Sequence, residues 1–247
     1  MIWARIGELF ASAASGVLDL GAEATANLSA LLERVRTTFV GDPETRRKVA
    51  FSIAMIALSA KMAKADGVVT VDEVAAFERL FDIPEEERRN VARVYDIAKS
   101  DVAGFEGYAM QLAALCDSSG PNCPMLQDIL DGLFHIAKAD GVLHEAELGF
   151  LARTAEIFSI DEATFDTIAA RHVADDTLGG PSPRAVLGLA VDASAAEAER
   201  RYRDLVREAH PDRAIARGLP EEFVAIATER VAAYNDAIAS IRAMEAA

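Results

Sequence analysis

The hexapeptide AKADGV occurs twice in this chain of 247 residues, at positions 63–68 and 137–142. In each copy a glutamate lies seven positions beyond the aspartate, as Glu73 and Glu147. An apolar segment with helical spacing precedes each copy, and an amphipathic segment follows it. The repeat therefore predicts two helix–turn–helix units. Because no long window alternates apolar and polar residues like a strand, the expected fold class is all-α.

The two repeated turns allow two interpretations. Gly67 and Gly141 suit the left-handed conformation that ends a helix, and the glutamates can cap the helix that follows. Asp-Gly followed by five residues and Glu also has the spacing of the second half of an EF-hand loop. Calcium requires six to eight oxygen ligands, and non-oxygen side chains occupy the earlier ligand positions, namely Met62, Lys64, Ile136 and Lys138. An ordinary EF-hand is excluded and capping is favoured. No cofactor is expected, and the remaining alternative is a divalent-cation site at Asp66, Glu73, Asp140 and Glu147.

Composition narrows the classes of function. A formal net charge of −15 argues against a nucleic-acid protein, because phosphate binding requires a positive surface. Two cysteines cannot form a disulfide scaffold, so a reducing, cytoplasmic compartment is the simpler prediction. Cys116 and Cys123 flank a short turn and are expected to be free thiols, since no second Cys/His pair is nearby to complete a zinc site. No catalytic triad or nucleotide-binding motif is present, and no enzymatic activity is expected.

The first 40 residues carry an apolar stripe. Its members follow one another by three or four positions, as on a helix: Ile2, Ile6, Leu9, Ala13, Val17, Leu20, Ala24, Leu28, Leu31 and Val35. Docking on the chain's own core is favoured. A membrane-surface or dimer contact through residues 2–36 is the alternative, although this segment lacks the basic face that anionic lipids prefer.

Breaks in the pattern divide the chain into units. We predict an N-terminal helical segment over 1–40, a helical domain over 41–175, a Gly/Pro-rich linker over 176–181 and a C-terminal unit over 182–247. The C-terminal unit has a basic helix from Ala195 to Ala209 and a long helix from Pro220 to about Met244. Their apolar stripes face each other, which predicts an antiparallel hairpin joined by an irregular loop containing His210-Pro211-Asp212-Arg213.

Both larger units resemble known domains. The paired turns with their glutamates make residues 41–175 similar to the TerB-like, tellurite-resistance-associated helical domain, which implies a compact bundle and a poorly defined metal role. His-Pro-Asp after a basic helix makes residues 182–247 resemble the J domain of DnaJ-type co-chaperones. That resemblance implies stimulation of a DnaK-type ATPase, with a partner-binding set of His210, Pro211, Asp212, Arg200, Arg203, Arg207 and Arg213. The order of the two domains is that of DjlA-like co-chaperones.

The C-terminal unit departs from the J-domain pattern at four packing positions, which carry Arg184, Ala198, Arg201 and Ile238. The function expected from the whole chain is that of a co-chaperone, with the TerB-like domain binding unknown clients, a metal or an envelope or stress-related partner. The alternative is a TerB-like metal- or stress-response protein that uses its J-like unit only for docking.

Overall fold

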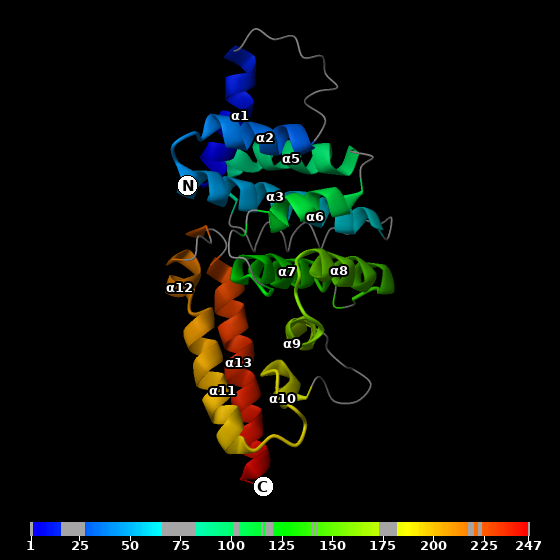
Figure 1. The fold of residues 1–247 in the computed structure, drawn as a ribbon, viewed down its shortest axis with the longest axis vertical. Helices are drawn as coiled ribbons and strands as arrows, with labels where there is room; N and C mark the ends of the chain where they lie inside the picture. Colours follow the sequence, from blue (N-terminus) through cyan, green and yellow to red (C-terminus); the bar gives the residue numbers. More distant parts are fainter. Residues whose placement is uncertain are drawn as a thin grey trace.

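The computed structural model describes residues 2–15, 28–65, 83–100, 104–114, 116, 121–139, 141, 143–172, 182–216, 220–221 and 224–246. Every regular element among these residues is helical, which confirms the predicted fold class. The molecule is elongated: a helical bundle occupies one end, and a long hairpin made by the C-terminal unit extends from it (Figure 1).

The bundle is built around α3, Pro43–Ala65, whose residues from Val49 to Ala63 are all buried. Helices from both sides of the sequence contact α3: α1 (Ile2–Ser15), α2 (Leu28–Thr38), α5 (Arg88–Ser100), α6 (Phe105–Ala113), α7 (Pro124–Ala137) and α8 (Glu145–Ile157). The long apolar run in α3 is therefore a buried central helix. No helix in the described part of the chain is both long and apolar enough to span a membrane.

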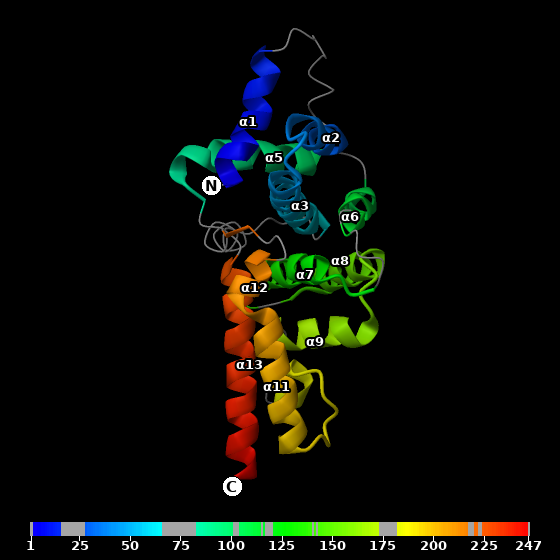
Figure 2. The same ribbon diagram turned by 60° about the vertical axis from the view of Figure 1, so that its left-hand side comes forward.

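The described part of the N-terminal stripe lies on two helices, α1 and α2, which contact each other as well as α3. Val17, Leu20 and Ala24 lie outside the described residues. Its described members Ile2, Ile6, Leu9, Leu31 and Val35 are buried in the main core. The favoured prediction, docking on the chain's own core, is confirmed for these residues. The expectation of one continuous helical stripe is wrong, since α1 and α2 run in different directions (Figure 2).

The second copy of the repeat has the predicted helix–turn–helix form. Helix α7 ends at Ala137, Gly141 has a positive φ of 91°, and α8 begins at Glu145. The turn of the first copy lies outside the described residues. The rest of the bundle is also helical: η1 (Glu85–Glu87) leads into α5, and α9 (Glu162–His172) follows α8.

The two cysteines correct a prediction. Cys116 and Cys123 form a disulfide, not the expected free thiols. Their Cα atoms lie 6.6 Å apart, within the range that a disulfide can bridge. The bond joins the segment after α6 to Cys123, the residue that immediately precedes α7.

The C-terminal unit forms the predicted antiparallel hairpin. Helix α11 spans Ala195–Ala209, and α13 spans Val224–Glu245. The Oγ of Ser194 accepts a hydrogen bond from the N–H of Glu197, while the Glu197 carboxylate accepts one from the N–H of Ser194, which together cap the start of α11. Short helix α10 (Pro183–Val186) completes the hairpin's own apolar core of Val186, Leu187, Ala198, Leu205, Ala209, Tyr234, Ala237, Ile238 and Ile241.

Candidate partner-binding site

The residues His210, Pro211 and Asp212, here called the HPD turn, connect α11 to a short helix. Pro211 begins α12, Pro211–Ala216, so the predicted irregular loop is partly helical. Proline suits the first position of a helix, because its fixed φ is already helical and the missing N–H would have no partner there. His210 has an extended ψ of 132° and therefore separates the two helices.

The HPD turn is tied by local hydrogen bonds and open to solvent. The backbone N–H of Asp212 donates to Nδ1 of His210 at 3.2 Å, and the N–H groups of Arg213 and Ala214 donate to the His210 carbonyl. The side chains of His210 and Asp212 are 54% and 88% exposed. The turn therefore presents an imidazole and a carboxylate from a defined backbone to an incoming partner.

The predicted arginines also lie at the surface. Arg200, Arg203 and Arg207 are exposed on α11, and Arg213 is exposed on α12. Arg203 donates to the carbonyl of Glu199, and Arg207 pairs with Asp204 at 3.4 Å. These contacts are between neighbours on exposed helix surfaces and contribute little stability. The guanidinium groups are thus available to an acidic partner surface.

The four departures from the J-domain pattern fit the hairpin. Arg184 donates to the carbonyl of Ala193 at 2.8 Å, and Arg201 donates to that of Leu187 at 3.3 Å. Ala198 and Ile238 are buried in the hairpin core. Polar contacts to the segment between α10 and α11 therefore replace part of the aromatic packing, and the hairpin remains closed.

The predicted metal residues are only partly described. Asp66, Glu73 and Asp140 lie outside the described residues. Glu147 is 1% exposed, and its carboxylate accepts a hydrogen bond from the N–H of His144 at 2.9 Å. Glu147 thus caps α8, as the favoured interpretation of the second repeat predicts. Among the residues that can be described, no three Asp, Glu, His or Cys side chains gather as metal ligands.

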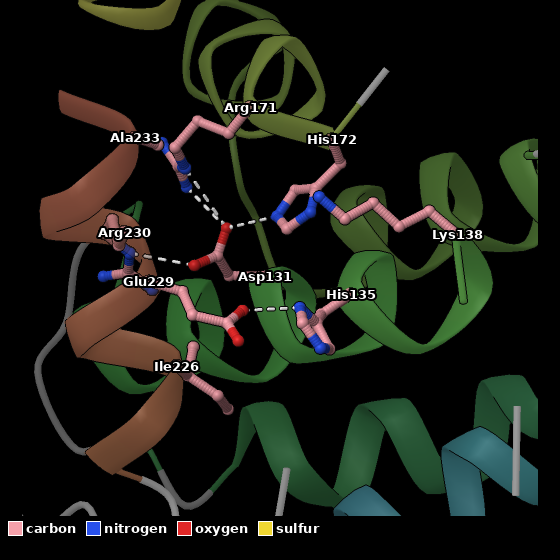
Figure 3. Close-up of a pocket in the computed structure, with 9 residues that line it drawn as sticks. All are labelled: Asp131, His135, Lys138, Arg171, His172, Ile226, Glu229, Arg230 and Ala233. Atoms are coloured by element: carbon pink, nitrogen blue, oxygen red, sulfur yellow. Dashed lines mark hydrogen bonds and ion pairs between the residues drawn. The ribbon is translucent and has the colours of Figure 1, made fainter. Parts of the chain in front are cut away.

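A second polar site, which the sequence did not predict, joins the bundle to the hairpin. We call Asp128, Asp131, Arg171, His172 and Arg230 the Asp131 cluster; all their side chains are 9% exposed or less. Figure 3 shows side chains from α9 and α13 converging on Asp131 of α7. One carboxylate oxygen of Asp131 binds Nη2 of Arg171 at 2.7 Å and Nε2 of His172 at 2.9 Å. The other accepts from Nε of Arg230 at 3.0 Å.

Further contacts extend the cluster along α13. Nη1 of Arg230 lies 2.8 Å from Asp128, and Nη1 of Arg171 donates to the hydroxyl of Tyr234 at 3.2 Å. His135 pairs with Glu229 beside a small cavity of about 70 Å³. Asp128 and Asp131 stand three positions apart in a predominantly apolar helix. That spacing places both carboxylates on one side of α7, and it is the sequence signal that could have indicated buried partners.

The electrostatics of the cluster follow from burial and pairing. Burial alone would raise the pKa of Asp131, but Arg171, Arg230 and His172 outweigh it and hold this pKa well below the ordinary value of 3.8. Burial opposes the charge on Arg230 too, yet Asp131 and Asp128 raise its pKa. For His172 the burial effect dominates and lowers the pKa from 6.5, although Asp131 acts in the opposite direction. The cluster therefore contains a charged aspartate, charged arginines and a neutral histidine at pH 7.

The low pKa of His172 predicts a loss of stability in mild acid. An unfolded histidine binds a proton near pH 6.5, whereas folded His172 resists protonation because burial, together with the positive charges of Lys138 and Arg171, outweighs the opposite effect of Asp131. The unfolded state thus binds more protons, and the free energy of unfolding falls as the pH drops below 6.5 toward the folded pKa. Urea unfolding at pH 7.5 and 5.5 measures this loss.

The His172→Gln variant should lose less stability between these two pH values than the parent. The same substitution at His210, whose side chain is 54% exposed, is the control for replacing a histidine away from the cluster. Equal losses in the parent and in His172→Gln would contradict the assignment to His172.

Comparisons with known proteins agree with the architecture. The family model described as "Tellurite resistance protein TerB" matches residues 52–170. "Co-chaperone protein DjlA" of Photobacterium profundum is 29% identical over 223 residues, covering 79% of this chain and 78% of the relative. The Escherichia coli K12 protein of the same name is 23% identical over 222 residues, covering 81% of each chain. No solved structure matches this chain. The chain is therefore DjlA-like and contains a TerB-like helical domain.

Proposed function

We propose that this protein is a co-chaperone that stimulates ATP hydrolysis by a DnaK-type chaperone through the HPD turn. The observation that carries the proposal is the solvent-open HPD turn, which directly follows a basic helix in a hairpin joined to a TerB-like domain. The relatives that span about four fifths of the chain are named co-chaperones, which supports the same function.

In this proposal the chaperone, and not this protein, hydrolyses ATP. The HPD turn supplies an oriented imidazole and carboxylate, while the arginines of α11 attract an acidic surface of the partner. The TerB-like domain binds the client proteins. These clients can be identified among the proteins that co-purify with the full chain.

The direct experiment is a steady-state ATPase assay of a DnaK-type chaperone with increasing amounts of the full chain. A concentration-dependent rise in the rate of phosphate release is the expected result. An unchanged ATPase rate at saturating amounts of the folded chain would contradict the proposal.

The basic face of α11 should act mainly through long-range attraction. Arg203→Ala combined with Arg207→Ala is expected to raise the half-maximal concentration for stimulation about fivefold at low salt, since each exposed ion pair contributes less than about 1 kcal/mol. Salt screens such attraction over about 8 Å at physiological ionic strength, so the difference should shrink as salt increases. Titrations at several salt concentrations measure it.

The control replaces two exposed arginines on the bundle, Arg36 and Arg153, by alanine and keeps the same net charge as the test variant. This control should behave like the parent at every salt concentration. A salt-independent loss in the α11 variant would indicate a local structural effect in place of attraction.

A further inference from the structure

The TerB-like domain and the hairpin share one hydrophobic core. Ala214 of α12 and Ile226 and Ala227 of α13 are buried in the same cluster as the bundle helices, separate from the hairpin's own core. The contact is close at Gly132 of α7, where a Cβ atom would lie 2.8 Å from Cδ1 of Ile226 and 2.9 Å from Cε of Met55. The start of α13 is therefore packed against α3 and α7.

Polar contacts hold the same two bodies together. Arg230 reaches from α13 to both aspartates of α7, and Arg171 reaches from α9 to the Tyr234 hydroxyl. Gly188, after α10, has a φ of +67°, and a Cβ there would lie 2.9 Å from Oγ1 of Thr167 on α9. Helix α9 thus lies against the hairpin at a second place, which fixes the direction of the hairpin as well as its point of attachment.

The docked end of the hairpin is the end that carries the HPD turn (Figures 1 and 2). Ala214, which is fully buried in the main core, comes two residues after Asp212. The backbone N–H of Ala214 donates to the carbonyl of His210 at 3.1 Å. The bundle therefore holds the HPD turn through its contacts with α12 and α13, while the side chains of His210 and Asp212 remain exposed to solvent.

We propose that the TerB-like domain is a structural part of the HPD site, and that Arg230 is the positioning residue that holds the turn in its docked orientation. The proposal rests on the proposed function for its effect on the chaperone. Docking orders the turn before the partner arrives, so the partner does not lose affinity by ordering it. An undocked hairpin would keep the same contact residues but bind the chaperone more weakly.

The docking is tested by a distance measurement that needs no chaperone. One spin label is attached at Arg153→Cys on α8 of the bundle, and the other at Asp236→Cys on α13 of the hairpin. The native cysteines are bonded to each other and therefore do not react with the label. The full chain should give one narrow distance distribution, and Arg230→Met should broaden it. Arg242→Met is the control, because Arg242 lies on the same helix and pairs with Glu199 inside the hairpin; its distribution should stay narrow.

The functional measurement is a titration of chaperone ATPase stimulation. Arg230→Met should raise the half-maximal concentration about fivefold with the maximal rate unchanged, because only the ordering of the turn is lost. Arg230→Lys retains a charge but lacks the guanidinium fork, so its half-maximal concentration should lie between those of the parent and Arg230→Met. Arg242→Met should have the half-maximal concentration of the parent.

A second variant changes the bundle side of the same interface. Gly132→Val places methyl groups against Ile226 and should reproduce both effects, whereas Gly149→Val on α8, where a Cβ meets no atom within 4 Å, should have neither. A broad distribution in the parent, or an Arg230→Met protein with a narrow distribution and parental stimulation, would overturn the proposal. If the parent fails to stimulate the chaperone at all, the proposed function is wrong, and the distance data still decide the docking.

Discussion

Replacing His210 by glutamine should abolish stimulation of the chaperone ATPase while changing the free energy of unfolding by less than about 0.5 kcal/mol. The side chain of His210 is 54% exposed, and its contacts are to Asp212. No core packing is lost in the variant, so a functional defect cannot come from unfolding. ATPase rates with saturating variant, and urea unfolding of the same preparation, measure the two effects separately.

Asp212→Asn should likewise abolish ATPase stimulation with little change in the free energy of unfolding, since the Asp212 carboxylate is 88% exposed. Asp236→Asn is the matched control: it makes the same chemical change at an exposed position of α13 and should leave stimulation at the parental level. Full stimulation by His210→Gln would refute the assignment of the HPD turn, whereas a lowered melting temperature would show that the turn contributes to the fold.

Local sequence signals correctly predicted the helices whose ends are marked by capping residues, glycine or proline. Helix α11 spans the predicted Ala195–Ala209 because Ser194 and Glu197 cap its start and Pro211 stops its continuation. Gly141 and the capping glutamate Glu147 likewise place the turn between α7 and α8. In these cases the signal lies within four residues of the boundary, so the sequence alone is sufficient.

Contacts between distant segments could not be predicted in this way. The stripe of the first 35 residues has helical spacing throughout, but only the contacts of α1 and α2 with α3 show that it is divided between two helices. The stripe of α13 predicted the hairpin, yet Ile226 and Ala227 at its start serve the bundle core. The partners of Asp131 lie 40, 41 and 99 positions away, so no local pattern relates them.

The largest loss of stability from a single substitution is expected at Asp131. Asp131→Leu removes the carboxylate that Arg171, His172 and Arg230 share and leaves buried positive charge without compensation. Breaking a buried ion pair on one side typically costs about 3–5 kcal/mol, which is a large part of the stability of an ordinary domain. Urea unfolding at pH 7.5 measures the loss. Glu156→Gln, in an exposed pair with Arg153, should change the free energy of unfolding by less than about 0.5 kcal/mol.

A rescue experiment distinguishes uncompensated charge from lost packing. Adding Arg171→Met, Arg230→Met and Asp128→Asn to Asp131→Leu removes the buried positive charges and the Asp128 charge that pairs with Arg230, and apolar replacements of buried ion pairs are often neutral or stabilising. The quadruple variant should therefore recover most of the stability that Asp131→Leu loses. Because Arg230 also holds the hairpin, the recovered protein should still show the broad interdomain distance distribution of Arg230→Met. A quadruple variant no more stable than Asp131→Leu would mean that the shape of the cluster, and not its charge balance, holds α7, α9 and α13 together.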